Sequence, residues 1–96
     1  MDIDNQFKII LMTRQEAYEI IDSELDYQKA NADTDTHIVS DFPLSSGLTA
    51  IDVKLETAKR QWYYSKAPYP DAMEEIRKIA AICVQMIEKY GCNKRK

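Results

Sequence analysis

Apolar residues recur at spacings of three and four after Thr13, which is the pattern of an amphipathic helix. The positions that share this face are Ala17, Ile20, Ile21 and Leu25. Thr13 and Glu16 have the spacing of a capping box, in which the Thr13 hydroxyl accepts the Glu16 backbone N–H and the Glu16 carboxylate accepts that of Thr13. We therefore predict a helix over residues 14–30.

A second periodic segment predicts a helix over residues 46–64, beginning near Ser45 or Ser46. Its apolar positions form one seam, made of Leu48, Ile51, Leu55, Ala58 and Trp62. A seam with these spacings packs antiparallel helices at a shallow angle. We expect this helix to form an antiparallel pair around Trp62 with another helix of the chain.

The partner in that pair is a helix predicted over residues 72–90, with Asp71 as its N-cap and Gly91 as its stop. Its middle, residues 79–84, is apolar nearly all round, so it must be covered on most sides. Because only two other helices are available, we expect another subunit to cover part of it. Cys83, inside this run, is expected to be a buried small hydrophobe.

The rest of the chain is predicted as an apolar N-terminal arm over residues 1–12, a long loop over 31–46 and a basic tail over 92–96. Periodicity cannot decide whether residues 7–12 form strand or helix. The helical domain itself covers residues 13–91. The predicted fold class is therefore all-α: a three-helix unit, consisting of an antiparallel helical hairpin plus an N-terminal helix, completed into a helical bundle by oligomerisation.

The net charge of −3 argues against a partner that is a DNA or RNA polymer. Residues 1–48 carry about −7 and residues 49–96 about +4, an asymmetry that suits docking between copies but is also typical of two solvated faces. The sequence contains no signal peptide and no apolar stretch long enough to span a membrane, which favours a cytoplasmic protein without a membrane partner.

Three carboxylates are candidates for a metal site. Asp52 and Glu56 lie four positions apart and share one helix face, and Glu75 could approach them across the antiparallel pair. Facing carboxylates in helical bundles bind Mg²⁺ or Mn²⁺ through hard oxygen ligands. The alternative is a solvated surface on which these acids pair with neighbouring lysine and arginine side chains.

A second candidate site would hold a nucleotide-like small molecule. Cationic side chains can bind phosphate, aromatic rings can stack on a base, and an amide can contact a base or ribose edge. The residues with these properties are Tyr27, Gln28, Arg60, Trp62, Tyr63, Arg77 and Lys78. The alternative is that Trp62 is a core residue and that the end of the first helix is an ordinary polar face.

Three blocks, residues 21–28, 48–59 and 75–91, resemble small phage and bacterial proteins related to the MazG-like, all-α nucleoside triphosphate pyrophosphohydrolases. The first block contains an acidic E-x-x-Y-Q ending of a helix, and the other two resemble the helices that carry the E-E-x-x-E and E-x-x-D motifs. The resemblance implies a helical bundle completed by dimerisation or higher assembly, with a nucleotide-sized pocket. In enzymes of the family, four acidic side chains hold Mg²⁺ for hydrolysis between the α and β phosphates.

Carried over by position, Asp52 and Glu56 match the outer acids of the first motif, and Glu75 matches the first acid of the second. Val53 and Lys78 stand where the resemblance places the other two acids. A lysine in place of a carboxylate changes the site by two charges, which opposes a divalent ion and favours direct binding of phosphate.

We therefore expect a non-catalytic, nucleotide-binding homo-oligomer without a cofactor. Small phage proteins of this kind can sequester the cyclic or modified nucleotide signals of bacterial defence systems. One alternative is an Mg²⁺-dependent nucleoside triphosphate pyrophosphohydrolase of the MazG-like type. A second alternative is a protein-interaction module that inhibits a host enzyme, with that host protein as its partner.

Overall fold

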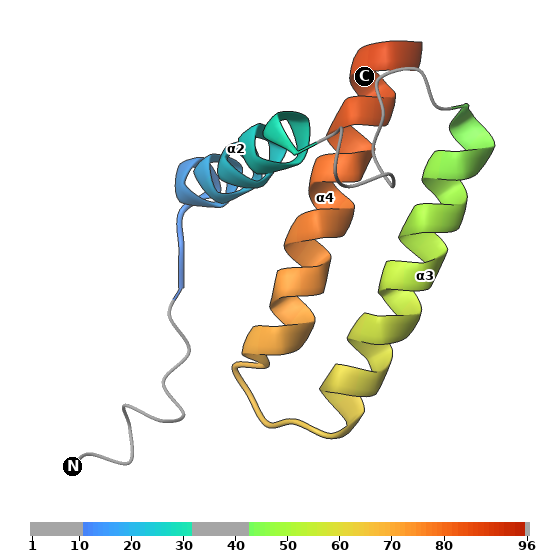
Figure 1. Cartoon of the computed structure of the whole chain (residues 1–96). Coiled ribbons are helices and arrows are strands. Elements are labelled where there is room, and N and C mark those ends of the chain that lie inside the picture. Colours follow the sequence, from blue (N-terminus) through green and yellow to red (C-terminus); the bar gives the residue numbers. More distant parts are fainter. Residues whose placement is uncertain (1–10, 32–42, 96) are drawn as a thin grey trace.

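The computed structural model describes residues 11–31 and 43–95, and within these residues the chain forms three helices and no strand (Figure 1). The helices are α2 (Arg14–Ala30), α3 (Leu44–Tyr63) and α4 (Pro70–Tyr90). The predicted all-helical fold class is thereby confirmed. None of these helices is both long enough and apolar enough to cross a membrane, a finding that covers the described residues only.

The predictions for the first ten residues and for most of the long loop lie outside the described part of the chain. Leu11 and Met12, at the end of the predicted arm, are exposed and precede α2 without helical structure. Residues 92–95 of the predicted tail are exposed and non-helical.

The central element is α4, because it packs against both other helices (Figure 1). α3 runs antiparallel beside α4, to which it is joined by a short turn, and α2 crosses α4 on another side. Among the three described helices, α2 and α3 do not contact each other. The three helices therefore form an open arrangement in which α4 lies between two neighbours.

The capping box at the start of α2 is present. The Thr13 backbone N–H donates to Glu16 Oε1 at 2.9 Å, and the Glu16 backbone N–H donates to Thr13 Oγ1 at 3.1 Å. These two hydrogen bonds satisfy backbone and side-chain groups that the first turn of a helix leaves without intrahelical partners.

The starts of the other two helices differ from expectation. α3 begins at Leu44, directly after Pro43, and its first turn has no side-chain cap. The prediction that Asp71 is the N-cap of α4 is wrong, because the helix begins at Pro70 and the left-handed Tyr69 occupies the cap position. Proline fits the first helical position well, since its fixed φ is helical and its missing N–H has no partner to lose there.

The buried apolar core is small, consisting of Leu25, Ala58, Ala72, Ala81 and Ile82 among the described residues. Trp62 is not part of it: its exposed fraction is 56%, which contradicts the alternative that Trp62 is a core residue of the pair. The buried residues of α3 and α4 beside Trp62 are alanines, Ala58 and Ala72, which line the contact between the two helices. Trp62 lies over the pair instead.

The apolar middle of α4 is covered more completely than expected. Ala81 and Ile82 are fully buried, and their neighbours in residues 79–84 are half-buried. Cys83 is half-buried as well, so the expectation that it is buried holds only in part. Contacts with α2 and α3 on two sides of α4 account for this burial. The exposed apolar residues of α4 lie nearer its two ends.

Candidate functional site

Two polar side chains of α2, Glu24 and Gln28, are almost completely buried against α4, with exposed fractions of 6% and 3%. Gln28 Nε2 donates to Glu24 Oε2 at 3.1 Å and to the backbone oxygen of Lys78 at 3.4 Å. Gln28 Oε1 accepts from Gln85 Nε2 at 2.8 Å. Polar groups at this depth require such partners, so the network fixes how α2 sits on α4.

Arg77 joins this network from α4. Its Nε donates to Glu24 Oε1 at 2.7 Å, a charge-assisted hydrogen bond to a buried carboxylate. In the described part of the chain, the two terminal nitrogens of the guanidinium make no hydrogen bond. Glu24 thus holds the side chain at one edge and leaves its other donors available.

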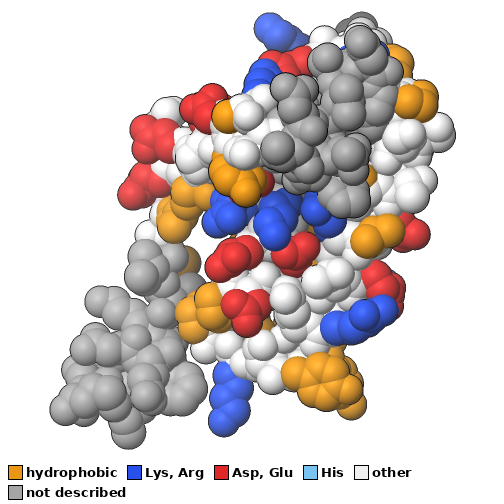
Figure 2. Space-filling model, in the orientation of Figure 1, with side chains coloured by type: hydrophobic (Ala, Val, Ile, Leu, Met, Phe, Trp, Pro, Cys, Tyr) orange, Lys and Arg blue, Asp and Glu red, His pale blue; other side chains and the backbone are white. Residues whose placement is uncertain are grey.

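Lys78 is the second cation of the site. Its Nζ lies 3.0 Å from Glu75 Oε2, one turn earlier on α4, and both side chains are partly buried. Figure 2 shows Lys and Arg side chains gathered near the centre of the molecular face in view, with Asp and Glu side chains directly beside them. We call the six residues with these contacts the polar cluster: Glu24, Gln28, Glu75, Arg77, Lys78 and Gln85.

The three candidate metal ligands are not brought together. Asp52 and Glu56 are exposed on α3, whereas Glu75 is bound to Lys78. The described residues contain no group of three acidic, histidine or cysteine side chains that could hold a metal ion. Within residues 11–31 and 43–95, the arrangement of this single chain therefore offers no carboxylate set for Mg²⁺.

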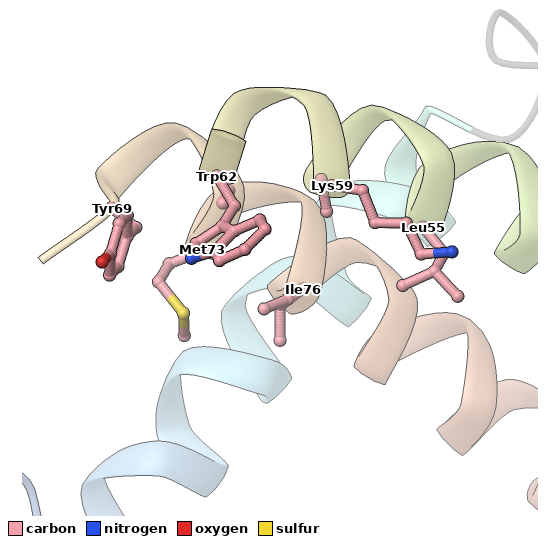
Figure 3. Close-up of a pocket in the computed structure, with 8 residues that line it drawn as sticks. Leu55, Lys59, Trp62, Tyr69, Met73 and Ile76 are labelled. Atoms are coloured by element: carbon pink, nitrogen blue, oxygen red, sulfur yellow. The ribbon is translucent and has the colours of Figure 1, made fainter. Parts of the chain in front are cut away.

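Trp62 lies in a different place, a shallow groove of about 230 Å³ between α3 and α4 near the turn that joins them (Figure 3). The groove is lined by Leu55, Ala58, Lys59, Trp62, Tyr69, Ala72, Met73 and Ile76. Among the described residues, Lys59 is the only charged one that lines the groove. None of the three predicted phosphate-binding cations reaches it.

The groove and the polar cluster are on opposite sides of α4. Ile76 lines the groove and Lys78 belongs to the cluster, and two positions along an α-helix are separated by about 200° around its axis. The predicted aromatic and cationic residues are therefore divided between two faces. The remaining candidates, Tyr27, Arg60 and Tyr63, are exposed side chains outside both.

Sequence reasoning selected Gln28, Glu75, Arg77 and Lys78 but did not select Glu24 or Gln85 as site residues. A signal for Glu24 was present, since it lies four positions before Gln28 and beside the apolar position Leu25. Polar residues on an otherwise buried helix stripe need buried partners. The identity of those partners on α4 depends on the tertiary arrangement and has no signal in a single sequence.

Comparison with known proteins adds no relative, since no family model, no curated protein and no solved structure matches this chain.

Proposed function

We propose that this protein binds a nucleotide or a related phosphate-bearing small molecule at the polar cluster, without hydrolysing it. The observation that carries the proposal is the state of Arg77. Its Nε is held by the buried Glu24 carboxylate, while its terminal nitrogens are without a partner among the described residues. A guanidinium held in this way presents a planar pair of donors that matches two oxygens of a phosphate.

Lys78 supports binding rather than hydrolysis. The MazG-like resemblance assigns acids to positions 75 and 78, but Lys78 pairs with Glu75 at 3.0 Å. Glu24 and Glu75 are thus each matched by a cation, and the cluster has no excess of carboxylates to attract a divalent ion. Phosphate is instead bound directly by the two cations, and the proposal requires no cofactor.

The proposed role of such binding is sequestration. A small protein that holds a nucleotide tightly lowers its free concentration in proportion to the number of copies present. In keeping with the resemblance to small phage proteins, we propose a cyclic or modified nucleotide signal of a bacterial defence system as the ligand. The site of action is then the cytoplasm of the host.

The test is isothermal titration calorimetry and thermal unfolding with a panel of cyclic di- and trinucleotides, ADP-ribose derivatives and nucleoside triphosphates. A ligand that binds only the folded state raises its stability by about 2.7 kcal/mol at a hundred times its Kd. Arg77→Lys keeps a cation beside Glu24 but removes the fork, so we expect affinity to fall about 10- to 100-fold. Lys78→Gln should weaken binding similarly.

The matched control is Lys66→Gln, which removes one positive charge from the turn between α3 and α4. It should leave affinity nearly unchanged, because screening limits the effect of a distant exposed charge. A panel in which no ligand raises the melting temperature would overturn the proposal. So would an Arg77→Lys variant and a Lys78→Gln variant that both bind like the original chain.

Hydrolysis is tested separately by pyrophosphate release from nucleoside triphosphates with Mg²⁺ or Mn²⁺. We expect none. Release that disappears in Asp52→Ala or Glu56→Ala would instead support the MazG-like pyrophosphohydrolase, with a metal site that forms only in an assembly.

A further inference from the structure

The α3–α4 hairpin carries a continuous row of exposed apolar side chains along one face. The residues are Leu48, Leu55 and Trp62 on α3 and Met73, Ile76, Ile87 and Tyr90 on α4. Their exposed fractions run from 42% to 56%, although they recur every seven positions on α3 and at spacings of three and eleven on α4, which keep them on one side of each helix. We call these seven residues the hairpin face.

α2 does not cover the hairpin face. It binds α4 through Arg77, Lys78, Gln85 and Glu88. Arg77 and Glu88 each lie one position, about 100°, after a residue of the face, Ile76 and Ile87, which stay 45% and 55% exposed. Lys78 and Gln85 each lie two positions from the same two residues. Two positions correspond to about 200° around the helix axis. The face is therefore a surface of the α3–α4 pair alone. An exposed apolar surface of this length marks an interaction site.

We propose that the occupant of the hairpin face is a second copy of this chain, related by a two-fold axis, so that two hairpins form an antiparallel four-helix bundle. The pattern of side-chain sizes is self-complementary, as an isologous interface requires. On α3, Leu48 and Trp62 each lie seven positions from Leu55, so reversing the helix places one opposite the other. Leu55 then meets its own counterpart.

The same symmetry holds on α4. Met73 and Tyr90 are equally distant from a point between Ala81 and Ile82, and so are Ile76 and Ile87. Small, half-buried side chains, Ala80 and Cys83, lie on either side of that point. Small residues at the centre allow two helices to approach, while larger residues pack towards the ends.

Charges beside the row favour this partner. Asp52 and Lys59 each lie four positions after a residue of the face on α3, Leu48 and Leu55, and thus border the same edge. They are seven positions apart, with Leu55 almost midway between them. An antiparallel copy therefore places Asp52 of each chain near Lys59 of the other, which gives two opposite-charge pairs across the interface.

The groove provides a further fit. It lies at the Trp62 end of the hairpin face, and the reversed copy brings its Leu48 to that end. A volume of about 230 Å³ with an apolar lining accommodates a leucine side chain. A 20-residue helix is about 30 Å long, and two packed helices are about 20 Å wide. The area of the hairpin face is therefore about 600 Å², which approaches the roughly 800 Å² that each partner buries in a stable interface.

The experiment is analytical ultracentrifugation of the full chain without ligand, so its outcome does not depend on the proposed nucleotide. We expect a dimer. Leu55→Lys places a charge at the centre of the face and should give a monomer that keeps its helical circular dichroism. The matched control is Val53→Lys on the same helix, which is 61% exposed and points about 200° away from Leu55. It should remain dimeric.

A charge exchange tests the orientation. Asp52→Lys should weaken dimerisation about five- to tenfold through two like-charge contacts, and the double variant Asp52→Lys with Lys59→Asp should restore it. The two positions are too far apart along α3 to pair within one chain. A monomeric original chain, or equal dissociation by Leu55→Lys and Val53→Lys, would overturn the proposal. A double variant no better than Asp52→Lys would overturn the antiparallel pairing.

Discussion

Arg77 Nε lies 2.7 Å from the buried Oε1 of Glu24, and this ion pair connects α2 to α4 at the centre of the polar cluster. The same contact has two consequences. It compensates the charge of a carboxylate that is removed from water, and it orients the guanidinium. Stability, and the ligand binding that we propose, therefore depend on the same hydrogen bond.

We predict that Arg77→Met lowers the free energy of unfolding by about 2 kcal/mol, because it leaves the Glu24 carboxylate buried without a cation. This loss is smaller than for a fully buried ion pair, since the Arg77 side chain is 34% exposed and water screens its charge. The control is Lys29→Met, which breaks a second α2–α4 ion pair, Lys29–Glu88, with side chains 56% and 53% exposed. That variant should change stability by less than about 0.5 kcal/mol. Urea denaturation measures both. Equal effects would contradict a special role for Arg77.

Ile82 is the largest completely buried side chain of the described residues. We predict that Ile82→Ala costs about 3 kcal/mol, from lost apolar burial and from the cavity left beside small alanine neighbours. In a domain with so few buried apolar side chains, that is a large part of the total stability. Val53→Ala, at an exposed position, should cost less than about 0.5 kcal/mol. Chemical denaturation that ranks the two variants equally would contradict the assigned core.

The capping box predicts a pH dependence. The hydrogen bond from the Thr13 backbone N–H, and then that with its side chain, hold the pKa of the Glu16 carboxyl below its ordinary value of 4.5. A carboxyl with a lowered pKa in the folded state stabilises that state above its ordinary pKa, and the contribution is lost as the pH falls through the folded value. The stability difference between the original chain and Glu16→Gln should therefore shrink below pH 4.5. A difference independent of pH would contradict this.

Gly91 ends α4 with φ of +76°, a conformation that L-residues rarely adopt. A Cβ added there meets no atom within 4 Å, so substitution costs only backbone conformational energy. Its ψ of 166° places it in a region that is essentially restricted to glycine, so we predict that Gly91→Ala lowers the free energy of unfolding by about 1 to 3 kcal/mol. Thermal unfolding checks this value, and a harmless Gly91→Ala would refute it.

The sequence was most informative where both partners of an interaction are close together. The start of α2 is determined by Thr13 and Glu16, three positions apart, and the end of α4 by a single glycine. The periodicity of α3 correctly grouped the residues that share a face. It could not show which neighbour covers that face, and Trp62 is exposed whereas Ala58, on the same seam, is buried.

The candidate site was predictable by residue type but not by pairing. Arg77 and Lys78 were chosen as cations, yet Glu24 lies 53 positions before its partner Arg77, and only the packing of α2 on α4 joins them. The same packing separates Trp62 from these cations. Spacing along one helix could have predicted that separation, since Ile76 and Lys78 are on opposite sides of α4.

Because α2 contacts α4 and not α3, it can open as a cooperative unit of its own while the hairpin stays folded. Amide hydrogens of α2 should then exchange with solvent faster than those around Ala81 and Ile82. Each opening also withdraws Glu24 from Arg77. The lifetime of a bound ligand would thus depend on how often α2 opens, as well as on the strength of the contacts between the ligand and the protein.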